Sequence, residues 1–252
     1  MNGLQYLDYG LDTIDYTTNL PNPVVKEYDG VKVVRDDLID GGTKRRAFYV
    51  YIKSKPDIEE FVYASPRQGY AQLSLAYVCK DLGRRATVTV PQGKRYWLTE
   101  KAEELGANII EVPMGFLTHI QYVAKEYCLD NGAHLIPFGG DHPIIVRAMC
   151  EVAKSLNINP KEVWSVMSSG VLSRGLQMAW PNSIVYGVKI GHNTKKQEQG
   201  RATCLRSKYK FQQECKKIER PPFPSSLTYD SKAWSFIKEK ASDGALFWNV
   251  GR

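Results

Sequence analysis

Short strand-like and helix-like segments alternate along the middle of this chain, and the alternation restricts the folds open to it. Residues 60–64, 86–90 and 108–112 are short apolar or β-branched runs, and helical spacing separates them. Strands that follow one another with a helix between them pair in parallel and are covered by helices on both faces. The sequence therefore predicts an α/β protein with parallel, doubly wound sheets.

The same pattern extends over the rest of the chain, except for residues 1–30, which we expect to be a loop-rich arm. Further strands are expected at residues 31–35, 133–138, 162–167, 183–188 and 245–249. Helices are expected to start after residue 44, at residues 70–82, from residue 99, at 119–131, from about 143 to 156, at 171–178 and at 231–241.

Composition excludes several classes of protein. The 252 residues are 43% hydrophobic and 24% charged, as in folded globular proteins. The N-terminus lacks the basic and apolar regions of a signal peptide, and no apolar run approaches the roughly 18 residues of a membrane span. We expect a cytoplasmic protein without a membrane partner. The five cysteines lack CxxC spacing and the four histidines lack paired metal spacing, so we expect reduced thiols and no metal.

Positive charge is concentrated in one part of the chain. Residues 189–220 hold ten lysines and arginines against three glutamates, which gives +7, equal to the formal net charge of the whole protein. A local excess of this kind favours contact with a polyanion such as DNA. The alternative is a solvated basic loop, since its aromatic stacking partners are limited to Tyr209 and Phe211.

One lysine lies where a flexible turn meets an apolar element. Gly41 and Gly42 free the backbone just before Lys44, and residues 47–52 are apolar and aromatic. Burial there disfavours the ammonium form, and we expect the neighbouring Arg45 and Arg46 to act in the same direction. A neutral amine forms a Schiff base with a carbonyl. The alternative is that these three cations form a solvated face at a helix start.

The segment Gly-Gly-Thr-Lys-Arg-Arg resembles the cofactor-lysine segment of pyridoxal-phosphate (PLP) enzymes of the tryptophan synthase β-like fold, also called fold type II. The nearest branch contains aminocyclopropane-carboxylate (ACC) deaminase and D-cysteine desulfhydrase. The resemblance implies a two-lobed, three-layer αβα protein with parallel sheets. Residues 1–52 and 157–252 would form the larger PLP-binding domain, and residues 53–156 the smaller inserted domain. It also implies a homodimer, and Lys44 as catalytic and cofactor-binding residue.

A turn of small residues follows the strand expected at 162–167. Backbone N–H groups of Ser168, Ser169 and Gly170, at the start of a helix, can bind an anion. A routine strand-to-helix loop is the alternative. The turn resembles the phosphate loop of the family, which makes these three residues cofactor ligands with Arg174 as an addition, although Val171 and Leu172 replace a glycine and a hydroxyl residue.

The turn after the strand at 60–64 resembles the family turn that reads Ser-x-Gly-Asn or Ser-Asn-x-x-Arg. The resemblance implies that Ser65 is a substrate-binding and catalytic residue, which contacts the substrate carboxylate or acts in proton transfer. Gln68 would replace the asparagine that faces the phenolate oxygen of the cofactor. Pro66 and Arg67 depart from the pattern, and Arg67 is expected to pair with an anionic group of an unusual substrate.

Two later segments also match the family in order. Residues 228–233 resemble a Tyr-x-Gly-Lys-Ala signature, which makes Tyr229 a substrate-binding residue, and residues 138–143 resemble a Gly-Gly-Ser-Asn-Pro turn. Asn249 takes the place beside the pyridine nitrogen, or simply caps the final strand. Together the matches predict a PLP-dependent, lyase-type enzyme acting on an amino-acid group through Lys44.

The sequence leaves the reaction open among elimination, deamination and decarboxylation, because the same cofactor supports all three. One alternative is the same chemistry on an amino-acid-modified thymidine in bacteriophage DNA, with residues 189–220 bound to phosphates. A second alternative is a basic binding protein that has the fold and lacks the activity.

Overall fold

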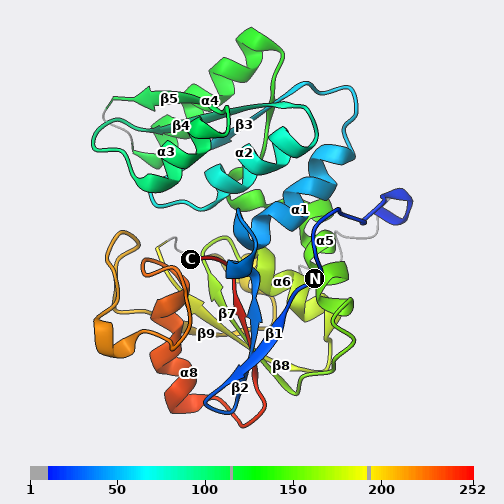
Figure 1. Cartoon of the computed structure of the whole chain (residues 1–252), viewed down its shortest axis with the longest axis vertical. Coiled ribbons are helices and arrows are strands. Elements are labelled where there is room, and N and C mark those ends of the chain that lie inside the picture. The colour runs from blue at the N-terminus through cyan, green and yellow to red at the C-terminus, as the bar shows by residue number, and fades with distance from the viewer. Residues whose placement is uncertain (1–10, 114–115, 192–193) are drawn as a thin grey trace.

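The computed structural model describes residues 11–113, 116–191 and 194–252, and it contains two sheets flanked by helices (Figure 1). The six-stranded sheet has the order β1-β2-β10-β7-β8-β9. Its strands are β1 (Val25–Tyr28), β2 (Val31–Arg35), β7 (Glu162–Met167), β8 (Ile184–Lys189), β9 (Thr203–Arg206) and β10 (Leu246–Asn249). The four-stranded sheet has the order β5-β4-β3-β6, with β3 (Glu60–Ala64), β4 (Arg85–Pro91), β5 (Asn108–Val112) and β6 (His134–Leu135).

The helices follow the alternation that the sequence predicts. The α-helices are α1 (Gly42–Lys53), α2 (Ala71–Asp81), α3 (Trp97–Glu104), α4 (Leu117–Asn131), α5 (Pro143–Lys154), α6 (Val171–Ala179), α7 (Lys196–Gln199) and α8 (Trp234–Lys240). Short 3-10 helices are η2 (Leu11–Thr13), η3 (Asp36–Leu38), η4 (Phe138–Gly140), η5 (Lys217–Glu219) and η6 (Asp230–Ala233). Figure 1 shows α2, α3 and α4 around the four-stranded sheet, with α1 and α5 between the two sheets.

The prediction of parallel sheets is confirmed. Every pairing is parallel except that of β1 with β2, which is antiparallel. Strands β3 and β7 are buried at every position, as expected for strands covered on both faces. The expected loop-rich arm contains the edge strand β1, and the strand expected at 133–138 is limited to β6. The division of the chain at residues 52 and 156 stays a prediction.

Strand β10 lies in the middle of the larger sheet and fixes the start of α1. Trp248 in β10 donates its indole N–H to Asp36 Oδ2 (3.2 Å) and to Thr43 Oγ1 (3.0 Å). Asp36 is fully buried and also forms a salt bridge with Arg46 of α1 (2.8 Å). These buried bonds hold the residue before Lys44 against the central strand. No described helix has the length and apolar character needed to cross a membrane.

Candidate active site

A pocket lies between the two sheets, at the carboxyl ends of their strands. The segments after β3, β6, β7 and β10 meet there with the start of α1, which is the usual place for ligands in open α/β sheets. The residues lining it that matter most below are Lys44, Tyr63, Gln68, Gly139, Ser168, Ser169, Gly170 and Tyr229. Lys44 is the only charged residue among the described residues of this lining.

The turn before Lys44 requires glycine. Gly41 and Gly42 both have positive φ, 85° and 63°. A Cβ on Gly42 would lie 2.2 Å from the carbonyl oxygen of Val250. The Thr43 N–H donates to the same carbonyl (2.9 Å), so the backbone of α1 starts directly against the end of β10. Only a residue without a side chain permits this approach.

The Lys44 amine lies in the pocket, where Nζ donates a hydrogen bond to the carbonyl oxygen of Gly139 (3.1 Å). Burial lowers the pKa of Lys44 to about 8, and the negative charge of Asp230 partly opposes that shift. With a pKa of about 8, about a tenth of the molecules carry a neutral amine at pH 7. An ordinary lysine is almost entirely protonated at that pH, so the site supplies a usable nucleophile.

The expected effect of the neighbouring arginines on Lys44 is wrong. Arg46 is neutralised by the buried carboxylate of Asp36, and Arg45 pairs with Asp81 (2.7 Å). Both guanidinium groups therefore form ion pairs away from the amine. Burial alone lowers the pKa of Lys44.

The glycine turn of η4 forms the opposite wall. The Gly139 N–H donates to the Tyr63 hydroxyl (3.0 Å), and the Ser169 hydroxyl donates to the Gly139 carbonyl (3.2 Å). A Cβ on Gly139 would lie 2.3 Å from Cβ of Ser169. Burial raises the pKa of Tyr63 to about 12, so its hydroxyl keeps its proton and remains a donor.

The turn between β7 and α6 has the form of an anion cradle. Ser168, Ser169 and Gly170 line the pocket, and Gly170 precedes the nine-residue helix α6 with a φ of 72°. A Cβ on Gly170 would lie 2.0 Å from the Glu198 carbonyl oxygen. Free N–H groups of a helix start, together with the helix dipole, favour an anion. The expected addition, Arg174, does not line the pocket and instead pairs with Asp141 (2.5 Å).

A buried carboxyl group next to Tyr229 was missed by the sequence analysis. Asp230 is fully buried, and its Oδ2 accepts a bond from the Val250 N–H (3.3 Å). Its Oδ1 is buried and has no partner among the described residues. Burial raises the pKa of this carboxyl well above its usual range. A buried, unpaired acceptor of this kind suits a ligand N–H, and the acid directly after Tyr229 was the available signal in the sequence.

Two residues of the turn after β3 are directed away from the pocket. The Ser65 hydroxyl donates to the Pro66 carbonyl (2.9 Å), within its own turn. Arg67 donates to the carbonyl oxygens of Pro91 (3.3 Å) and Gln92. Neither side chain is among the lining residues, whereas Gln68 is. In this structure the turn supplies Gln68 to the site and uses Ser65 and Arg67 for its own conformation.

Asn249 is also outside the pocket lining. Its amide nitrogen donates to Asp37 Oδ1 (2.7 Å) and to the Pro224 carbonyl (2.9 Å), and its Oδ1 accepts from the Ser225 hydroxyl (2.8 Å). The side chain is fully buried by these partners. The structure therefore places Asn249 outside the pocket lining, where it links β10 to neighbouring loops. Asp230 is also absent from the lining, and it directly follows the lining residue Tyr229.

The described residues contain no group of three or more histidine, cysteine or acidic side chains arranged for a metal ion. They offer instead an amine of lowered pKa and an anion cradle that line one cavity, together with an unpaired buried carboxyl oxygen on Asp230, the residue after Tyr229 of that lining. This set suits a small ligand that has a carbonyl carbon, an anionic group and a basic nitrogen.

Comparison with known structures identifies the fold as that of the PLP enzymes of fold type II, the tryptophan synthase β-like fold. An ACC deaminase homologue has a TM-score of 0.81 at 13% identity, over 99% of this chain and 94% of the other. The processed form of threonine deaminase isoform 2 from Solanum lycopersicum has a TM-score of 0.75 at 13% identity, over 99% of this chain and 84% of the other. No protein-family model matches the sequence.

A curated relative is closer in sequence than these structures. It is a glycyl-dTMP PLP-dependent decarboxylase from Pseudomonas phage M6, 24% identical to this chain. The alignment covers 89% of this chain and 96% of the relative.

Proposed function

We propose that this protein is a PLP-dependent enzyme, and the arrangement around Lys44 is the observation that carries the proposal. Lys44 would supply the amine for the aldehyde of the cofactor, Ser168, Ser169 and Gly170 would bind its phosphate, and Asp230, next to the lining residue Tyr229, would be the acidic partner of its pyridine nitrogen. The unpaired Oδ1 of Asp230 and the cradle at Gly170 fit such a group. When bound, PLP accepts the electron pair released at the α carbon of an amino acid.

Decarboxylation is the reaction that the pocket lining favours. Apart from Lys44, the described lining residues are uncharged, and Ala47, Ile145, Met149, Val171 and Leu172 form an apolar part. A substrate carboxylate there meets no arginine and is poorly solvated, which favours loss of CO₂ over retention of the acid. The bond between the α carbon and the carboxyl carbon breaks, CO₂ leaves, and Lys44 returns a proton to the α carbon.

The proposed substrate is an amino-acid group carried on a thymidine nucleotide. The decarboxylase of Pseudomonas phage M6 supports this class, since its name specifies glycyl-dTMP and the alignment extends over nearly its whole length. The basic segment 189–220 is compatible with a substrate that contains phosphate. Elimination or deamination of a free amino acid is the second candidate, and the deaminase-like fold favours it. The expected homodimer stays a prediction.

Two measurements test this proposal. The protein with added PLP is expected to develop a visible absorption band that Lys44→Ala lacks. Lys53→Ala is the matched control, because Lys53 ends the same helix but pairs with Asp15 at the surface. A band in Lys44→Ala equal to that of the parent would refute the role of Lys44.

Product analysis then separates the two candidate reactions. A thymidine nucleotide that carries an amino-acid group with a free carboxylate is expected to release CO₂ and keep its nitrogen. Release of ammonia from free amino acids, with no CO₂ from the nucleotide, would replace decarboxylation by deamination.

A further inference from the structure

A second cavity, of about 600 Å³, lies beside the Lys44 pocket. Pro66, Phe138, Ser168 and Phe211 line both, so the two spaces share a wall. A ligand that fills the second cavity can therefore extend a group toward Lys44 past the two phenylalanine rings.

The second cavity is strongly cationic. Its described lining residues include no carboxylate, and its cations are Lys189, Arg206, Lys208 and Lys210. Lys208 is paired with Glu219 (2.6 Å), and Lys189 donates to the Thr194 carbonyl (3.2 Å). The side chains of Arg206 and Lys210 are exposed and have no hydrogen-bond or ion-pair partner within residues 11–113, 116–191 and 194–252. This concentration of unneutralised charge suits an anionic ligand.

Two of these cations lie at the carboxyl ends of neighbouring strands. Lys189 and Arg206 are register partners at the ends of β8 and β9, and β8 pairs in turn with β7, whose end carries the Ser168–Gly170 turn. Neighbouring parallel strands lie about 5 Å apart, so the cations continue the edge on which the Lys44 pocket is built.

A buried lysine anchors the backbone of residues 210–211, which line this cavity. Lys232 in η6 is 1% exposed, and its Nζ donates to the carbonyl oxygens of Lys210 (2.8 Å) and Phe211 (3.0 Å). The ring of Phe211 packs edge-on against Tyr229 of the Lys44 pocket, with centroids 6.3 Å apart. The loop that presents Lys210 is thus anchored from inside.

We propose that this cavity binds the phosphodiester backbone of single-stranded DNA, so that the reacting nucleotide is part of a strand when its base passes Phe138 and Phe211 toward Lys44. The inference rests on the proposed function for the identity of the reacting group. The three cations that have no acidic partner, Lys189, Arg206 and Lys210, exceed what the phosphate of one nucleotide needs, and they fit neighbouring phosphates of a polymer. Aromatic rings at the entrance suit stacking with a base that has left its neighbours.

The test is binding of a labelled single-stranded DNA without any modified base, measured by fluorescence anisotropy over a range of salt concentrations. The protein is used without PLP. Because each phosphate contact to a single strand contributes about 0.7 to the slope of log affinity against log salt, the three cations without an acidic partner give a slope of about −2.1. The double variant Arg206→Ala/Lys210→Ala is expected to bind at least about tenfold more weakly, with a slope smaller by about 1.4.

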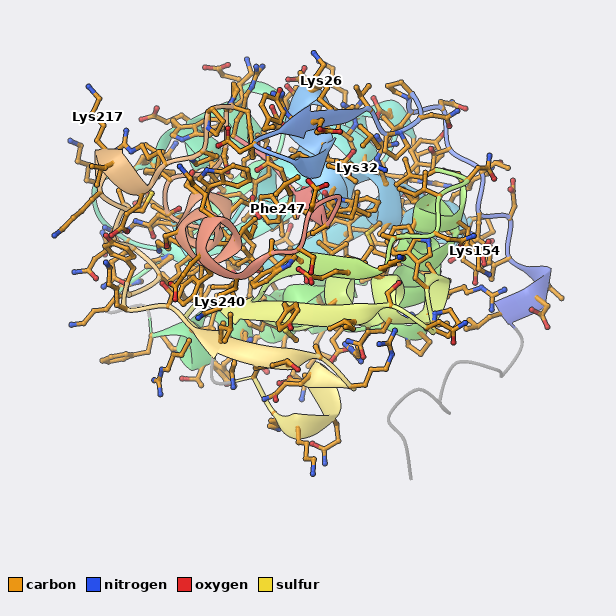
Figure 2. All side chains as sticks on the ribbon, turned by 90° about the horizontal axis from the view of Figure 1, so that it is seen from below. Lys26, Lys32, Lys154, Lys217, Lys240 and Phe247 are labelled. Atoms are coloured by element: carbon orange, nitrogen blue, oxygen red, sulfur yellow. The ribbon has the colours of Figure 1, made fainter. Side chains whose placement is uncertain are left out.

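The control is the double variant Lys26→Ala/Lys32→Ala, which removes the same net charge. Both lysines are exposed on the paired strands β1 and β2 (Figure 2). Neither is among the residues that line the cavity. It is expected to bind within about twofold of the parent. Equal weakening by both double variants, or binding of the parent that is insensitive to salt, would overturn the inference.

The outcome of this DNA-binding test is independent of the outcome of the test of the proposed function. DNA binding requires no cofactor and no turnover, so an absent visible band leaves the binding result intact. A protein that releases CO₂ from the free modified nucleotide but does not bind DNA would retain the proposed function and refute the strand-bound substrate.

Discussion

Replacing Lys44 by methionine is expected to stabilise the cofactor-free protein at neutral pH. Lys44 lies in the pocket with its pKa lowered to about 8 by burial, so its charged form is unfavourable in the folded state. Methionine has nearly the same length and carries no charge. The substitution therefore removes an electrostatic penalty, and it also removes the hydrogen bond to the Gly139 carbonyl.

The magnitude follows from the pKa of Lys44 in the two states, about 8 when folded against an ordinary value of 10.5. At 1.36 kcal/mol for each pH unit, the penalty on the folded protein below pH 8 is about 3 kcal/mol. Loss of the hydrogen bond costs about 1 kcal/mol. Lys44→Met is thus expected to raise the free energy of unfolding by about 2 kcal/mol at pH 7.

The stability difference between Lys44→Met and the parent is expected to change with pH in a definite direction. Between the folded pKa of about 8 and the unfolded value of 10.5, the unfolded protein binds more protons at Lys44. The stability of the parent therefore rises with pH in that window relative to the variant, which lacks the group. The advantage of Lys44→Met is expected to be full below pH 8 and to vanish, then reverse, toward pH 10.5.

Urea unfolding of the two proteins at about pH 7, 8.5 and 9.5 measures this difference. Lys26→Met serves as control, since Lys26 is exposed on β1 and is expected to change stability by less than about 0.5 kcal/mol at each pH. A parent more stable than Lys44→Met at pH 7, or a difference that does not depend on pH, would refute the burial of a charged amine at this position.

Three further predictions concern the surroundings of Lys44. Gly170→Ala is expected to lower stability by about 2–4 kcal/mol and to weaken PLP binding, because the added Cβ would clash with the Glu198 carbonyl at a positive φ. The control is Gly83→Ala, which has a φ of 63° and open space around the added Cβ, and it is expected to lower stability by about 1 kcal/mol. Asp230→Asn is expected to keep the visible band and to lower turnover at least about tenfold. It is also expected to stabilise the cofactor-free protein increasingly as pH rises above 3.8, because the raised pKa of Asp230 means that ionising this carboxyl destabilises the folded parent. Lys232→Met is expected to weaken DNA binding while the band persists, because the carbonyls that order the 210–211 loop lose their donor. Urea unfolding at several pH values checks the stability changes, spectra with added PLP and turnover rates check the cofactor and activity changes, and anisotropy checks DNA binding. Unchanged DNA affinity in Lys232→Met would contradict the anchoring role.

The parts of the fold and site that sequence could predict depend on local signals. Strands β3, β7 and β8 are short apolar runs between turn residues, and they fall at or within a residue of their expected positions. Lys44 follows a glycine pair whose backbone conformation and neighbours both require glycine. Local propensity and periodicity were therefore sufficient to predict the α/β fold and the position of Lys44 at the start of a helix.

The parts that could not be predicted depend on distant partners. Asn249 is bonded to Asp37, 212 positions away, and to Ser225, 24 positions away, and nothing beside it in the sequence reveals either contact. Ser65 and Arg67 occupy the expected turn, but the direction of their side chains is set by the backbone of that turn and of residues 91–92. The acidic residue at position 230 points to a binding role only once its burial and its unpaired carboxyl oxygen are known.

The place of β10 in the sheet also bears on the order in which the protein folds. Trp248 contacts Asp36 across 212 positions of sequence, and β10 separates β2 from β7, so the centre of the six-stranded sheet forms only after a very long loop has closed. Strands β3, β4 and β5 pair with strands close to them in sequence. Contacts of short range form faster, so the four-stranded sheet should assemble first. The Lys44 turn, tied to β10, would then be among the last parts to acquire its native geometry.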